Sequence, residues 1–157
     1  MNKLILVVLV VLVLGFLLFW RFFWPGTSGE QFSSDATVKI GAQTYKVQIA
    51  DTPALQTQGL SERKALPQNE GMLFVFPTAK LQAFWMKKML FPIDILWIVN
   101  NQVVGVVENA PPDNNLIPAI YSSPKDVDLV LEVNAGVVAR DKISVGDSVE
   151  IIGYTRK

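Results

Sequence analysis

Apolar and polar residues alternate along much of the chain, and this pattern predicts short β-strands. In residues 36–50 the alternation runs on both sides of Gly41 and Ala42, which is typical of a hairpin with one buried face. Residues 71–77, GMLFVFP, are apolar almost throughout. A bounded apolar run of this length indicates a strand that is buried on both faces.

A second hairpin is predicted in the middle of the chain. Residues 93–99 and 102–108 are rich in Ile and Val, and Asn100 and Asn101 separate them. Two Asn residues tolerate the positive φ of a two-residue hairpin turn. Residues 109–126 contain four prolines, so we expect a long loop there, and long loops in compact domains are often functional.

One short helix is expected after the first hairpin. Asp51 or Thr52 can serve as its N-cap, Pro53 suits its first turn, and Pro67 ends the helical pattern.

The C-terminal part of the chain continues the β pattern. Residues 128–133, DLVLEV, indicate one strand, and residues 148–152 indicate another after a turn at residues 145–147. Several short strands with one or two short helices favour a mainly β fold. We therefore expect a compact β-sandwich or barrel-like domain over residues 36–157.

The N-terminal residues 1–24 predict a transmembrane anchor or an uncleaved signal. Residues 4–20 are all apolar or Gly, and a helix of residues 4–24 approaches the roughly 30 Å thickness of the hydrocarbon layer. Lys3 and the free amine place more positive charge before this segment than Arg21 places after it, so the N-terminus is expected in the cytoplasm. Residues 25–35 are small and polar and indicate a flexible linker.

The alternative for this segment is a secretory signal that is cleaved, for which residues 27–29 offer a weak small-x-small site. Under either interpretation the β-rich domain lies outside the cytoplasmic membrane.

The composition removes several kinds of chemistry. The chain contains neither His nor Cys, so thiolate nucleophiles, disulfides, Ser-His-Asp triads and zinc thiolate sites are excluded. We expect no cofactor and no metal, and no complete catalytic motif is present. Without Lys3, Arg21 and Glu30, 12 basic residues stand against 13 acidic ones. They are scattered, which argues against a nucleic-acid partner.

Asp94 is a carboxylate in an otherwise apolar strand. Alternation over residues 93–99 places it on a face with apolar residues only. A buried carboxylate is costly unless it is paired. We expect it to meet one of the nearby cations, Arg63, Lys87 or Lys88, or several backbone amides. It can serve a binding site, or it can simply hold the turn at residues 91–92.

Glu132 is a second carboxyl group in a mostly apolar strand. In residues 128–133 it lies on the face opposite Leu131, and a solvated outer face explains it. If it approached Asp94, the two carboxyls could perform acid–base chemistry as in a hydrolase, or hold a hard cation.

Trp85 is the aromatic residue most expected at the surface. Phe84, Trp85 and Met86 cannot all point inward from one strand. An exposed Trp beside Lys87 suits stacking against a sugar or a peptide. Partial burial of Trp85 against the helix is the alternative.

Four segments resemble a known family when taken together. They are QGLSERKALPQNEGMLFVFP, FWMKKMLFPIDILWI, YSSPKDVDLVLEVNAG and ISVGDSVEI, and in this order they are similar to the signature blocks of the domain of unknown function 192 family over about residues 48–152. The resemblance implies a compact β-rich, sandwich-like domain, often secreted or placed behind one N-terminal hydrophobic segment, with no assigned activity.

The resemblance also marks individual positions. Those that carry over are Arg63 after Gly59 and Leu60, Gly71, Met72, residues 84–87, Pro92, Asp94, Glu132, Gly136 and residues 146–147. The chain departs from the family at Lys88 and Met89, where an Asn and a small hydroxyl residue are usual. That Asn either orients a ligand or caps a turn.

These observations lead to one leading hypothesis. We expect a membrane-tethered extracytoplasmic domain that binds an envelope glycan or peptide. Its candidate binding residues are Arg63, Trp85, Lys87, Asp94 and Glu132. The alternatives are a hydrolase that uses Asp94 with Glu132, and a structural or assembly partner in a membrane complex that presents an apolar surface around Trp97.

Overall fold

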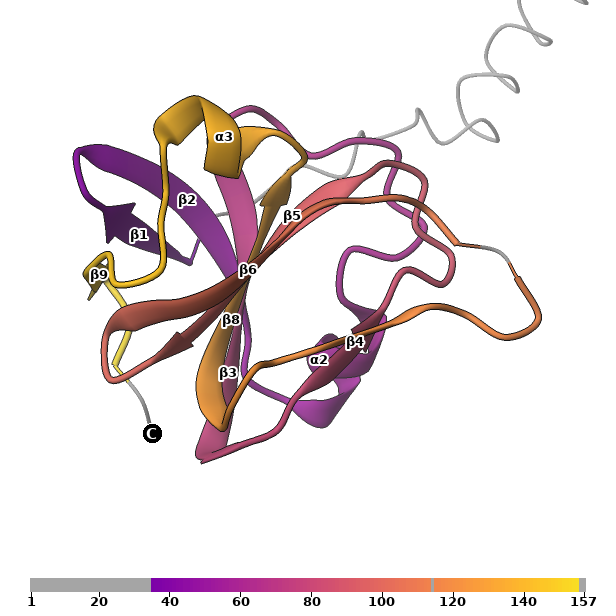
Figure 1. Ribbon diagram of the computed structural model, residues 1–157, viewed down its shortest axis with the longest axis horizontal. Helices are drawn as coiled ribbons and strands as arrows, with labels where there is room; N and C mark the ends of the chain where they lie inside the picture. The colour runs from indigo at the N-terminus through magenta and orange to yellow at the C-terminus, as the bar shows by residue number, and fades with distance from the viewer. Residues whose placement is uncertain (1–34, 114, 156–157) are drawn as a thin grey trace, which may run out of the picture. The chain divides into compact units, whose positions relative to one another are not determined.

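A seven-stranded sheet curls into a half-barrel in the computed structural model, which describes residues 35–113 and 115–155 (Figure 1). Its strands, in spatial order, are β6 (Gln102–Ala110), β5 (Ile93–Val99), β8 (Val127–Asn134), β3 (Glu70–Lys80), β2 (Gln43–Ala50), β1 (Ala36–Ile40) and β9 (Val149–Ile152). Neighbouring strands are antiparallel, except that β2 and β3 are parallel.

The two edge strands of this sheet approach each other at one end. Gln102 at the start of β6 forms an isolated antiparallel bridge with Ser148, just before β9. The Val103 N–H donates to the Asp147 carbonyl at 3.0 Å, and the Val149 N–H donates to the Asn101 carbonyl at 2.8 Å. These bonds satisfy edge groups that a flat sheet would expose, and they close one end of the half-barrel.

The inner face of the curled sheet carries one hydrophobic core. All seven strands contribute to it, and α3 (Val137–Asp141) adds Val137 and Val138. Tyr45, Leu73 and Leu131 are among its fully buried side chains. Burial of this apolar surface provides the main driving force for curling the sheet.

The outer face carries a second core, centred on Phe74, Trp97 and Val130. It is covered by the chain that follows α2 (Pro53–Gln58) and by a two-stranded sheet of β4 (Ala83–Trp85) and β7 (Ile120–Ser122). The central strands β5 and β8 are therefore buried on both faces, which explains their near-continuous apolar sequences.

The mainly β fold with two short helices confirms the sequence prediction. Asn100 and Asn101 have φ values of 51° and 57°, as expected for the second hairpin. Thr52 caps α2 by accepting a hydrogen bond from the Leu55 N–H at 3.3 Å. Residues 109–126 are not wholly a loop, because β7 lies within them.

The predicted anchor at residues 1–24 and all of the predicted linker except Asp35 lie outside the described residues. Neither described helix is long enough or apolar enough to cross a membrane.

Candidate functional site

A hollow of about 270 Å³ lies between the α2 region and the small β4–β7 sheet. Apolar and aromatic side chains provide much of its lining, and a few uncharged polar groups and one carboxyl interrupt them. The lining residues used below are Gln56, Gly59, Phe74, Gln82, Trp85 and Glu132. A concave, largely apolar hollow with few polar groups is typical of a small-molecule site.

The α2 helix forms one side of this hollow and is held firmly in place. Gln56 donates from its side-chain amide to the Val75 carbonyl at 2.8 Å and to the Ala50 carbonyl at 3.4 Å. The helix ends at Gly59, whose N–H donates to the Leu55 carbonyl at 2.8 Å. Gly59 has φ 52° and ψ −137°, a backbone conformation that is essentially restricted to glycine.

The small sheet forms the opposite side. Gln82 and Ser123 bind each other through two hydrogen bonds of 2.9 Å, one from the Gln82 N–H to the Ser123 hydroxyl and one from the Ser123 N–H to the Gln82 carbonyl. Phe84 of β4 meets Phe74 and Trp97 edge to face, with ring centroids 4.8 and 5.5 Å apart. Such aromatic contacts fix ring orientation, so the wall of the hollow is preorganised.

Trp85 stands at the rim of this hollow. It is 52% exposed, as alternation along β4 predicted. Its indole also lines a neighbouring hollow of similar volume, together with Lys87 and the turn at residues 61–62. Trp85 and Lys87 are therefore brought together, and both are accessible to a ligand.

Glu132 lies in the inner wall of the first hollow. On the outer face of the sheet it is flanked by Met72 of β3 and Ile95 of β5, its partners in the two ladders. It is only 5% exposed, and burial raises the pKa of its carboxyl to about 8. The carboxyl therefore holds its proton at neutral pH.

The expectation that Glu132 sits on a solvated outer face was wrong. The outer face of β8 is covered by α2, the residues that follow it, and the small sheet. Alternation had assigned Glu132 to the correct face but could not reveal the cover.

Arg63 lies on the turn after α2 and does not line either hollow. Its guanidinium donates to the side-chain carbonyl of Gln48 at 2.5 Å. Gln48, Met72 and Glu132 are successive cross-strand partners on one face, so Arg63 reaches the same face of the sheet as Glu132. Met72 lies between Gln48, to which Arg63 bonds, and Glu132 in the wall of the hollow.

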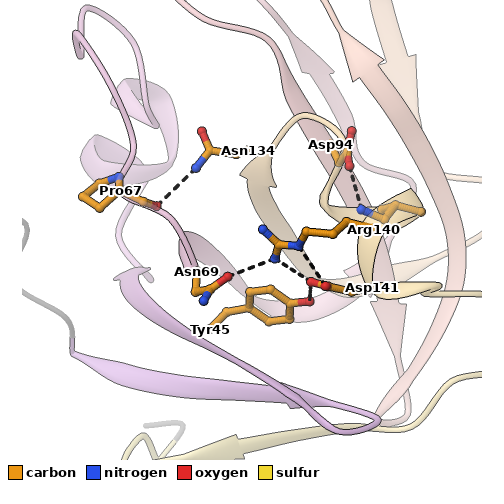
Figure 2. Close-up of polar contacts among 8 residues, drawn as sticks. Tyr45, Pro67, Asn69, Asp94, Asn134, Arg140 and Asp141 are labelled. Atoms are coloured by element: carbon orange, nitrogen blue, oxygen red, sulfur yellow. Dashed lines mark hydrogen bonds and ion pairs between the residues drawn. The ribbon is translucent and has the colours of Figure 1, made fainter.

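Asp94 is separated from the other predicted site residues. It is fully buried, and its two carboxylate oxygens accept hydrogen bonds of 2.8 Å from the backbone N–H groups of Asn109 and Val138. Figure 2 shows Asp94 bonded to the first turn of α3. Of the partners expected for Asp94, backbone amides are the ones found.

This arrangement gives Asp94 a supporting role that differs from the one expected. It joins the end of β6 to the start of α3, and it does not hold the turn at residues 91–92. The two backbone amides supply the hydrogen bonds that a buried carboxyl group needs, which accounts for its place in the core.

A second polar cluster ties α3 to the sheet and was missed by sequence reasoning. The Tyr45 hydroxyl donates to Asp141 at 2.6 Å, and Arg140 donates to the same carboxylate at 2.7 and 2.9 Å and to Asn69 at 2.9 Å (Figure 2). Tyr45 and Asp141 are 96 residues apart. No local pattern signals such a pair.

Lys88 and Met89, the two departures from the family pattern, occupy different settings. Lys88 has φ 62° and forms an exposed ion pair with Glu62 at 2.8 Å. Asn tolerates such a positive φ well, so the usual Asn suits a turn role here. Met89 is buried and lines the first hollow, so this substitution changes the wall of the site.

Residues 35–113 and 115–155 contain no group of three or more acidic side chains placed to hold a metal ion. Gln82, Phe74 and Gly59 are site residues that the sequence did not propose for binding. Gly59 and Phe74 lie within the first of the four family segments, whereas Gln82 lies outside all of them.

Comparison with known proteins agrees with this architecture. The family model of DUF192, "Uncharacterized ACR", matches residues 36–151. A crystal structure from Sinorhizobium meliloti 1021, described as that of a proposed transcription regulator, is 32% identical in sequence, with a TM-score of 0.70. The match covers 79% of this chain and 99% of that protein. The crystal structure of a protein of unknown function from Novosphingobium aromaticivorans DSM 12444 is 28% identical, with a TM-score of 0.68. The match covers 79% of this chain and 96% of that protein. No functionally curated protein matches the chain.

Proposed function

The chain belongs to the DUF192 family, and on this premise we propose that its β-rich domain is a ligand-binding module and not an enzyme. Its ligand is an envelope glycan or peptide that enters the hollow between α2 and the small sheet. The domain is held outside the cytoplasmic membrane by residues 4–24, or is secreted after their cleavage.

The observation that supports this proposal is the pairing of an accessible indole with a preorganised aromatic wall. Trp85 is half exposed at the rim, while Phe74 and Phe84 are locked edge to face behind it. Flat apolar faces of sugars and peptide side chains stack on such an indole. Lys87 beside Trp85 adds a polar contact at the entrance.

The arrangement favours binding over hydrolysis. A two-carboxyl hydrolase needs both groups across one cleft, about 5 to 10 Å apart. Asp94 and Glu132 occupy opposite faces of the sheet, and Asp94 is fully buried. The proposed binding residues are accordingly Trp85, Lys87 and Glu132, with Arg63 beside them and Asp94 as support.

The proposal is tested by titrating the full chain, kept in a mild detergent, with envelope glycan fragments and peptides by isothermal calorimetry. Replacing Trp85 with Ala is expected to weaken binding about tenfold, which corresponds to the roughly 1.4 kcal/mol of one good stacking contact. The matched control is Leu81→Ala, an exposed apolar residue outside both hollows. Equal ligand affinity in wild type, Trp85→Ala and Leu81→Ala would contradict the proposal.

The predicted topology has a test of its own. A reporter enzyme that folds only outside the cytoplasm, fused after Lys157, is expected to be active. Removal of residues 1–24 is expected to abolish that activity. An active reporter in the truncated chain would contradict the role given to this segment.

A role as an assembly partner is a second candidate, favoured by a different observation. Leu116 and Ile117 are 103% and 88% exposed in the loop before β7, and Ile120 pairs across strands with Trp85. Exposed apolar side chains that lie together are typical of interaction surfaces. The apolar surface expected around Trp97 is absent from the described part of the chain, since Trp97 is 1% exposed. Co-purification of a partner that is lost in Leu116→Ser would support this role.

A further inference from the structure

Two buried polar groups in the wall of the hollow have no hydrogen-bond partner among the described residues. The side-chain nitrogen of Gln82 is one, in a residue that is 7% exposed. The carboxyl of Glu132 is the other, in a residue that is 5% exposed, and burial alone, with no hydrogen bond, sets its raised pKa. Leaving such groups unpaired in a protein interior costs free energy. A ligand that satisfied both would recover that cost.

The electrostatic setting makes both groups donors. Among the described residues, Glu132 is the only ionisable side chain that lines the hollow, and its cross-strand neighbours Met72 and Ile95 are apolar. Its neighbours on the same face of β8, Val130 and Asn134, are uncharged as well. Arg63 reaches the same face of the sheet, but its guanidinium bonds to Gln48, and burial is the one influence on the pKa of Glu132. The carboxyl therefore stays protonated, so its O–H and the Gln82 amide both offer hydrogens.

We propose that the hollow recognises an uncharged acyl-amide group, of the acetamido type, whose carbonyl oxygen accepts hydrogen bonds from Gln82 and Glu132 and whose methyl group packs against Phe74 and Phe84. An N-acetylated sugar and an N-acetylated peptide both present this group. The inference rests on the proposed binding function and specifies what the site selects.

Other ligand chemistries fit these groups less well. A cationic ligand would meet the donor end of the Gln82 amide and would have to ionise a carboxyl that burial keeps neutral. A carboxylate ligand would bury a charge where no Lys or Arg lines the wall. An uncharged acceptor with an apolar methyl group satisfies both donors and the aromatic wall at once.

The experiment compares N-acetylglucosamine with glucose, which lacks the acetamido group, and with N-acetylalanine methylamide as the peptide source. Binding to the full chain in detergent is measured by calorimetry at about pH 6 and about pH 9, on either side of the Glu132 titration. We expect N-acetylglucosamine or the blocked peptide to bind at least about tenfold more tightly than glucose at pH 6. Whichever of these two probes binds more tightly identifies the ligand as an N-acetylated sugar or an N-acetylated peptide.

Two variants separate recognition from folding. Glu132→Gln keeps a donor but cannot titrate, so it is expected to bind the acetamido probe at both pH values, whereas wild-type affinity falls about tenfold or more between them. Gln82→Met keeps the volume and removes the donor, and it is expected to weaken only the acetamido probes. Circular dichroism at each pH verifies that every protein is folded.

The outcomes distinguish this inference from the function on which it rests. If glucose and the acetamido probes bind equally and both depend on Trp85, the hollow binds ligands but the acyl-amide selection is wrong. If none of the three probes binds, the inference fails outright. If other glycans or peptides also bind independently of Trp85, the proposed function fails with it.

Discussion

Asp94 and Glu132 lie on neighbouring strands, one register position apart, and face opposite sides of the same sheet. Asp94 pairs with Val133 on the inner face, whereas Glu132 pairs with Ile95 on the outer face. The inner carboxylate accepts two backbone amides, and the outer carboxyl accepts none. Two buried acidic residues in one sheet therefore have different consequences for stability, which experiments can separate.

Replacing Asp94 with Asn is expected to destabilise the fold by about 2 to 4 kcal/mol. The change keeps the size of the side chain but turns an amide NH₂ toward one of the two N–H donors, Asn109 or Val138. That N–H then loses its acceptor, in a buried position for Val138 and in a part-buried one for Asn109. Urea unfolding of the full chain, followed by circular dichroism, measures the difference in free energy of unfolding.

The control for this change is Asp126→Asn, at an exposed position before β8. It is expected to alter the free energy of unfolding by less than about 0.5 kcal/mol. Equal stability of Asp94→Asn and wild type would show that the bonds from Asp94 to the end of β6 and to α3 contribute little, and would return Asp94 to consideration as a ligand-binding group.

Glu132→Gln is expected to become more stable than wild type as the pH rises. The carboxyl has its ordinary pKa of 4.5 in the unfolded chain and a pKa of about 8 in the fold, because burial disfavours its charged form. Between these values the unfolded state binds fewer protons than the native state, so wild-type stability falls with pH. At about 1.4 kcal/mol per pH unit the accumulated loss is on the order of 5 kcal/mol at most.

Urea unfolding at about pH 4, 6 and 9 measures this effect. The advantage of the variant should grow between the first and last pH, and should stay constant at higher pH. Glu108→Gln, at an exposed position on β6, provides the matched control. A pH-independent difference between wild type and Glu132→Gln would show that the Glu132 carboxyl is ionised in the fold.

The local elements of this fold were predictable from sequence because their signals are local. The break at Gly41 in an alternating run defines the first hairpin, and the Asn100–Asn101 pair defines the second. Thr52 followed by Pro53 marks the start of α2. In each case the residues that carry the signal are the residues that form the structure.

The site was predictable only in part, because it depends on contacts between distant segments. Alternation placed Trp85 at the surface and Asp94 in the core, and both placements are correct. The partners of Asp94 are backbone groups 15 and 44 residues away, which no periodicity reveals. The hollow over Glu132 is walled in part by β4, and β4 pairs with β7, a three-residue strand within a proline-rich segment that has the composition of a loop.

Tyr45→Phe tests the polar cluster that joins α3 to β2. Tyr45 is 1% exposed and its hydroxyl donates to the Asp141 carboxylate. We expect a loss of about 1.5 to 3 kcal/mol at neutral pH, as for a hydrogen bond to a charged acceptor. Urea unfolding measures it, and Tyr121→Phe is the control, since its hydroxyl bonds to no other described residue.

The same variant should change the alkaline limb of the stability profile. Burial, followed by the adjacent Asp141, raises the pKa of Tyr45 above its usual value of 10. Above about pH 10 the unfolded chain loses this proton first, so wild-type stability falls there. Tyr45→Phe should not show that fall. An identical alkaline profile in both proteins would mean that the Tyr45 phenol ionises as freely in the fold as in the unfolded chain.

Gly59→Ala is expected to lower both stability and ligand affinity. Gly59 ends α2 in a conformation that side-chain-bearing residues avoid, and a Cβ there would lie 3.4 Å from the Phe74 ring in the wall of the hollow. The strain should cost about 1 to 3 kcal/mol in the free energy of unfolding. Relieving it requires a shift of the backbone that lines the site, so affinity for a bound glycan or peptide should fall as well.

Gly41→Ala separates the two effects. Gly41 has φ 58° in the β1–β2 turn, and a Cβ there would meet no other atom within 4 Å. This variant should lose stability through its backbone conformation alone and should bind ligand as wild type does. If both variants lowered affinity equally, the loss would follow from general destabilisation and the end of α2 would not shape the site. A loss confined to Gly59→Ala would show that the end of α2 sets the geometry of the hollow.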